Sequence, residues 1–97
     1  MICQHRTYQV RPGVMDEFVA LFCDHLVPLR KAYGFQVAGA WNDPETGTFV
    51  WVVCHEAPEG WDAAEKAYYA APERAELPAN PSDYLESSQT QLLRPVL

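Results

Sequence analysis

Four side chains in this sequence have the chemistry to move a proton or to stabilise negative charge: Arg6, Tyr8, His25 and Tyr68. Arg6 and Tyr8 are two positions apart in a strand-like run, so they share one face of that strand. A fixed guanidinium there can bind a carboxylate, an enolate or a phenolate, and the neighbouring phenol can donate to a developing oxyanion. The alternative is an ion pair at an interface, with the tyrosine as filler.

His25 and Tyr68 fall on apolar stripes of two predicted helices. His25 lies among Phe18, Phe22 and Leu29, where we expect a dehydrated, neutral imidazole that can act as a general base. A core histidine bonded to a backbone carbonyl is the alternative. Tyr68 lies on the inward side of the second helix, where it is either a hydrogen-bond donor to a pocket or a packing residue.

Two tryptophans lie on neighbouring strands of a predicted hairpin, Trp41 on the first and Trp51 on the second. They could form a flat platform for an aromatic ligand or anchor a dimer interface. With Gln4 and His5, they are the candidate substrate-binding residues.

The cysteines and histidines do not predict a metal site. Cys3, His5, Cys54 and His55 would gather near one edge of the sheet, but adjacent strand residues point to opposite faces and no zinc-type spacing occurs. Three widely spaced cysteines indicate reduced thiols and a cytoplasmic protein. No phosphate loop, dinucleotide fingerprint or nucleophile elbow is present, so we expect no cofactor.

The elements that position these residues follow from apolar periodicity and from breaks at proline and glycine. We expect a helix with an irregularity at Pro28 and an end at Gly34. The expected ranges are a strand at 2–10, a helix at 14–33, strands at 35–42 and 48–55, a helix at 61–71, a turn at 73–77 and a strand near 86–93.

This order predicts one α+β domain over residues 1–97 with the ferredoxin-like βαββαβ topology. Its four-stranded antiparallel sheet has the first and third strands in the middle and helices on one face. The strands carry apolar residues on both sides, so the uncovered face calls for a partner, and we expect a homodimer.

Composition excludes several classes of function. The chain has a net charge of -6 and no cluster of lysine or arginine, which disfavours nucleic acid and anionic membranes as partners. No apolar run reaches the roughly 20 residues that a membrane helix needs.

Three stretches carry a family resemblance: H-R-T-Y-Q-V-R-P-G-V-M-D-E-F at 5–18, H-L-V-P-L-R-K-A-Y-G-F-Q-V-A-G-A-W at 25–41, and L-L-R-P at 92–95. They resemble the NIPSNAP family of the dimeric α/β-barrel superfamily. The resemblance implies that two sheets face each other across a dimer and enclose a lumen. It also implies that Gln4, Arg6 and Tyr8 line that lumen.

Relatives in this superfamily include cofactor-free monooxygenases, isomerases, polyketide cyclases and haem-degrading enzymes. The second predicted helix has no histidine to ligate haem iron. The resemblance therefore implies that the lumen holds a small aromatic or polyketide-like molecule for cofactor-free oxygenation, cyclisation or isomerisation. The alternatives are non-catalytic binding of a small molecule and a protein-interaction module.

Overall fold

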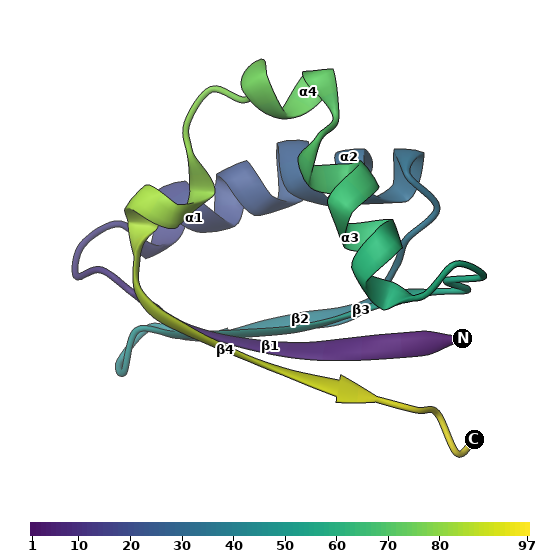
Figure 1. The fold of residues 1–97 in the computed structure, drawn as a ribbon. Coiled ribbons are helices and arrows are strands. Elements are labelled where there is room, and N and C mark those ends of the chain that lie inside the picture. Colours follow the sequence, from purple (N-terminus) through teal and green to yellow (C-terminus); the bar gives the residue numbers. More distant parts are fainter.

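A four-stranded antiparallel sheet forms one layer of the molecule, and helices form the other (Figure 1). The computed structural model describes residues 1–97. The strand order β2-β3-β1-β4 places β1 and β3 in the middle, which confirms the predicted ferredoxin-like α+β topology. The strands are β1 (Ile2–Val10), β2 (Gln36–Asp43), β3 (Thr48–His55) and β4 (Leu85–Leu93).

All the helical segments cover the same face of this sheet, and the opposite face is bare (Figure 1). None of them is long and apolar enough to cross a membrane. They are α1 (Met15–Leu21), the π-helical turn η1 (Phe22–Leu26), α2 (Val27–Ala32), α3 (Trp61–Tyr69), α4 (Pro72–Ala75) and the 3-10 turn η2 (Pro81–Tyr84).

The irregularity expected at Pro28 takes the form of the π-helical turn directly before it. Because proline has no N–H, the α-helical bond to the carbonyl of Asp24 cannot form. The Val27 N–H instead bonds the carbonyl of Phe22, five residues back. A π turn holds more residues than an α turn, so it changes which side of the helix each following residue faces. Arg30 consequently faces the sheet and is 2% exposed, whereas His25 is exposed.

Aromatic rings fill the centre of the core between α1, η1 and the sheet. Phe49 of β3 lies 5.0 Å from Phe18 and 4.9 Å from Phe22, centroid to centroid, in edge-to-face contacts. Each such pair contributes about 0.5–1.5 kcal/mol beyond the burial of its area. Tyr8 stacks on the same ring of Phe49 at 6.2 Å, so one candidate site residue is also part of the core.

The hairpin register separates the two tryptophans. Trp51 pairs with Ala40, and Trp41 pairs with Val50, so their side chains point to opposite faces. Trp51 is buried under the helices at 3% exposure, and Trp41 is 60% exposed. The predicted aromatic platform is therefore wrong.

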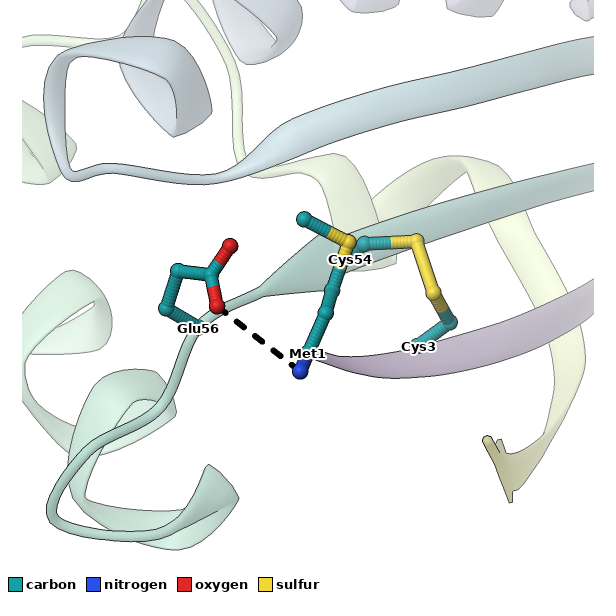
Figure 2. The surroundings of a disulfide bond; sticks show 4 residues. All are labelled: Met1, Cys3, Cys54 and Glu56. Carbon is teal, nitrogen blue, oxygen red and sulfur yellow. Dashed lines mark ion pairs between the residues drawn. A yellow bond between two sulfur atoms is a disulfide. The ribbon is translucent and has the colours of Figure 1, made fainter. Parts of the chain in front are cut away.

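Cys3 and Cys54 are directly opposite each other on β1 and β3 and form a disulfide (Figure 2). Figure 2 also shows the N-terminal ammonium of Met1 beside the Glu56 carboxylate, 3.7 Å away, at the same end of these two strands. The expectation of three reduced thiols is wrong for this pair, because antiparallel pairing places the two side chains on the same face. Only Cys23, which is exposed, is a free thiol.

Candidate functional site

Gln4, Arg6 and Tyr8 lie on the face of β1 that the helices cover. Arg6 pairs with Trp51 and Tyr8 with Phe49, and both of these partners are buried beneath the helices. The expectation that this group lines a lumen on the bare face of the sheet is therefore wrong. The prediction that Gln4, Arg6 and Tyr8 share one face of β1 is correct, but that face is the one covered by the helices and not the bare one.

Arg6 and Tyr8 help to enclose a cavity of about 340 Å³ between the sheet and the helices. That volume is in the range of small-molecule sites. Three arginines and three tyrosines stand out among the lining residues, which are Arg6, Tyr8, Leu26, Arg30, Trp51, Tyr68, Tyr69, Arg74, Asn80, Pro81, Ser82, Leu85 and Ser88.

Arg6 is held at the cavity by four neighbours. Its Nε donates to the Tyr8 hydroxyl at 2.8 Å, its Nη1 donates to Oε1 of Gln4 at 2.7 Å, and its Nη2 donates to the Tyr69 hydroxyl at 3.3 Å. Nη1 also lies 3.5 Å from Oε2 of Glu65. Burial disfavours the charged form of Arg6, but Tyr8, Tyr69 and Glu65 outweigh that effect and raise its pKa. Arg6 is therefore a permanent, fixed cation.

Arg30 forms a second, more deeply buried cation beside Arg6. Its Nη1 donates to Oε1 of Glu65, and its Nη2 donates to the Tyr69 hydroxyl at 3.3 Å. Glu65 thus bridges the two guanidinium groups with its two carboxylate oxygens. Both oxygens are engaged, so this carboxylate is an anchor and not a free base.

Each tyrosine hydroxyl in the cavity accepts a hydrogen bond from an arginine. Tyr8 accepts from Arg6 at 2.8 Å, and Tyr68 accepts from Arg74 at 3.2 Å. Tyr69 accepts from Arg6 and Arg30. A guanidinium can only donate, so each phenol oxygen must be the acceptor, and its own O–H remains available to donate.

Around its three arginines, the cavity therefore has more donors than free acceptors. Its guanidinium groups and phenol hydroxyls donate, while the acceptor oxygens of Gln4 and Glu65 are already bound by arginine. The buried indole N–H of Trp51 also has no acceptor. This arrangement suits a ligand with negatively charged or carbonyl oxygens.

His25 lies outside this cavity. The imidazole is exposed and lines a separate groove between α2 and α4, beside Asp24 and Glu73. The expectation that it sits on the apolar stripe is wrong, because the π turn rotates it outward. Tyr68, in contrast, lies on the inward side of α3 as predicted and is 1% exposed.

Two predicted substrate-binding residues also lie elsewhere. His5 is half-buried on the bare face of the sheet, where it pairs with Val52 and Gln91. Trp41 is exposed on that same face. Of the predicted substrate-binding residues, only Gln4 and Trp51 contact arginines of the cavity: Gln4 contacts Arg6, and Trp51 contacts both Arg6 and Arg30.

The four residues considered as metal ligands do not converge. Cys3 and Cys54 are joined to each other. Nδ1 of His55 accepts from the Ala57 N–H at 2.8 Å, which leaves Nε2 to donate to the Tyr33 carbonyl at 3.2 Å. Both nitrogens of this imidazole are therefore used inside the fold.

Four residues of the candidate site were not predicted from the sequence: Arg30, Glu65, Tyr69 and Arg74. An uninterrupted 3.6-residue period over 14–33 places Arg30 on the solvent side of the helix, opposite its apolar stripe. Pro28 was a signal that the period changes there. Tyr69 is adjacent to Tyr68 and is 46% exposed, so periodicity alone gave no reason to select it.

Comparison with known proteins is consistent with this fold. A family model described as NIPSNAP matches residues 3–97. No curated protein sequence matches the chain.

Several solved structures are similar to the chain over nearly its whole length. An uncharacterized NIPSNAP domain protein from Burkholderia xenovorans is 20% identical, with a TM-score of 0.82, and the match covers 99% of this chain and 95% of that one. A NIPSNAP family protein from Agrobacterium tumefaciens is 16% identical, with a TM-score of 0.83 and coverage of 98% and 92%. An antibiotic biosynthesis monooxygenase is 16% identical, with a TM-score of 0.70, and both chains are covered completely. These likenesses show the fold.

Proposed function

The chain belongs to the NIPSNAP family, and we propose that it binds a small aromatic or polyketide-like molecule in the cavity between its sheet and its helices. There it stabilises the enolate or phenolate form of that molecule for cofactor-free oxygenation, cyclisation or isomerisation. The observation that carries the proposal is the pairing of each cavity tyrosine with an arginine, which leaves three phenol protons as donors.

The chemistry follows from the charge of the donors. Arg6 stabilises negative charge on a ligand oxygen, and Tyr8, polarised by the same guanidinium, donates a hydrogen bond to that oxygen. Such donors lower the pKa of a bound phenol or enol, which then releases its proton to water. The cavity needs no internal base for this step, and Glu65 is unsuited to that role because both of its oxygens are bound by arginine.

The test uses 4-nitrophenol, whose anion absorbs visible light. In the presence of the protein, we expect the apparent pKa of this phenol to fall and its anion to bind with measurable affinity. Arg6→Gln and Tyr8→Phe should each weaken binding of the anion about tenfold, the effect of losing one charge-assisted hydrogen bond. Arg94→Gln, in the exposed C-terminal segment, is the matched control. An unchanged titration curve would refute the proposal.

A second candidate is non-catalytic binding of the same kind of molecule. The lack of an unengaged base in the cavity favours it, because a bound anion would then simply be held. Turnover assays with the ligand identified by screening separate the two: product formation supports an enzyme, and release of unchanged ligand supports a carrier or sensor.

The bare face of the sheet supports a homodimer (Figure 1). It presents Trp41, 60% exposed, and the half-buried Val50 and Val52 to solvent. A second copy packed against this face would bury these apolar groups and complete a barrel, with one arginine cavity on each protomer outside it. Native mass spectrometry should show twice the mass of the chain, and a monomer at micromolar concentration would refute the dimer.

A further inference from the structure

Arg74 differs from the other two cavity arginines in having most of its donors unengaged. Arg6 and Arg30 are both tied to Glu65. Arg74 makes one hydrogen bond, from Nη1 to the Tyr68 hydroxyl, and forms no ion pair. Its Nε and Nη2 therefore remain available at the mouth of the cavity, where it is half-buried.

Two aromatic rings hold this guanidinium in place. Its central carbon lies 4.7 Å from the ring centre of Tyr69 and 5.1 Å from that of Tyr68. Stacking of this kind orients a guanidinium before a ligand arrives, so less entropy is lost on binding. Arg74 is thus a preorganised cation that lacks a counter-charge.

Tyr69 spans the distance between Arg74 and Arg6. Its ring lies under Arg74, and its hydroxyl receives Nη2 of Arg6 at 3.3 Å. One tyrosine side chain therefore contacts both guanidinium groups, with Arg74 over its ring face and Arg6 at its hydroxyl. A flat ligand with an acidic group at each end can be bound by both of them.

The geometry points to Arg74 as the anchor for a carboxylate on the ligand. The ligand is then an aromatic or enolic acid, with its phenol or enol oxygen at Arg6 and Tyr8 and its carboxylate at Arg74. This inference rests on the proposed function, since it assumes that the cavity is a binding site, and it adds the chemical class of the molecule.

Charge balance supports an acidic ligand. Three guanidinium groups line the cavity, and the carboxylate of Glu65 is the only one paired with them, although the chain as a whole carries a charge of -6. A carboxylate matches the planar fork of one guanidinium in a two-bond contact.

The experiment compares 6-hydroxy-2-naphthoate with its methyl ester by isothermal titration calorimetry. The pair share the ring and the hydroxyl group and differ in the negative charge. We expect the acid to bind the unmodified protein at least about tenfold more tightly than the ester, as one charge-assisted contact provides. Equal affinities would overturn the anchor while leaving the cavity as a binding site. No binding of either compound, together with no binding of 4-nitrophenol, would overturn the proposed function itself.

Variants of Arg74 then test the residue. Arg74→Gln should weaken binding of the acid about tenfold and leave binding of the ester unchanged. Arg74→Lys keeps the charge without the fork and should recover part of the loss, and Arg94→Gln should have no effect. If Arg74 only supported the packing of Tyr68 and Tyr69, its loss would weaken both compounds equally, and that result would refute the inference. The comparison of the acid with its methyl ester uses the unmodified protein, so it tests the inference even if a variant folds poorly.

Discussion

The guanidinium carbon of Arg30 lies 3.9 Å from the centre of the Tyr68 ring, although the two residues belong to different helices. This cation–π contact is desolvated, and such contacts contribute about 2 kcal/mol. It helps to pack α3 against α2. The packing here uses a charged side chain, whereas helices usually pack through apolar side chains. The candidate site is thus part of the packing between layers, so its stability and its binding properties are coupled.

Removal of the Glu65 charge should destabilise the fold. In Glu65→Gln, Arg30 stays buried without a counter-charge, and Arg6 loses the same partner. Breaking a buried pair from one side costs about 3 kcal/mol, and we expect a loss of about this size in the free energy of unfolding, measured in urea.

A double variant, Arg30→Met with Glu65→Met, is the control for that experiment. It removes both charges, so it should recover most of the lost stability. Glu59→Gln, on an exposed loop, should change little. If the double variant were less stable than the single one, the loss would not come from the unpaired charge.

Substitution of His25 should leave ligand binding unchanged. The imidazole is exposed in the groove between α2 and α4 and does not line the cavity. We expect His25→Gln to change the free energy of unfolding by less than about 0.5 kcal/mol and to bind 4-nitrophenolate like the unmodified protein. A marked loss of binding in calorimetry would restore the general-base role that the sequence suggested.

The fold could be predicted from the sequence because its signals are local. Alternation in β1, the proline and glycine breaks and the apolar stripes fixed the order of elements, and the expected range of the first strand matches β1 (Ile2–Val10). The topology followed from the handedness of crossovers, which does not depend on side-chain detail.

The site was less predictable because it depends on phase and on long-range pairing. A single π turn exchanged the environments of His25 and Arg30. Glu65 acquires its role only when α3 packs over α2, and nothing local to the sequence marks that contact. For β1, periodicity grouped Arg6 with Tyr8 correctly, but it does not tell which face the helices cover.

The Tyr33 hydroxyl should make stability depend on alkaline pH. It donates to Oε2 of Glu73 at 2.9 Å and so ties the end of α2 to α4, the helix that carries Arg74. This hydrogen bond, with burial and the nearby negative charge, raises the pKa of Tyr33 above 10.0. A raised folded-state pKa means that the contact stabilises fully below the unfolded value and is lost as pH rises through the folded value.

The measurement is the difference in unfolding free energy between the unmodified protein and Tyr33→Phe. We expect the unmodified protein to be more stable near neutral pH and the difference to shrink above about pH 10. A constant difference for Tyr33→Phe would show that the hydroxyl does not donate to Glu73.

The disulfide between Cys3 and Cys54 should be a major source of stability. It joins residues 51 positions apart, so it restricts the unfolded chain strongly. A bond that closes a loop of this size contributes about 2–4 kcal/mol, and a reducing agent should lower the free energy of unfolding by that amount. Cys54→Ala should be insensitive to the reductant. Alkylation of the denatured, unreduced protein should label Cys23 alone; labelling of all three cysteines would instead support the reduced thiols that the sequence predicted.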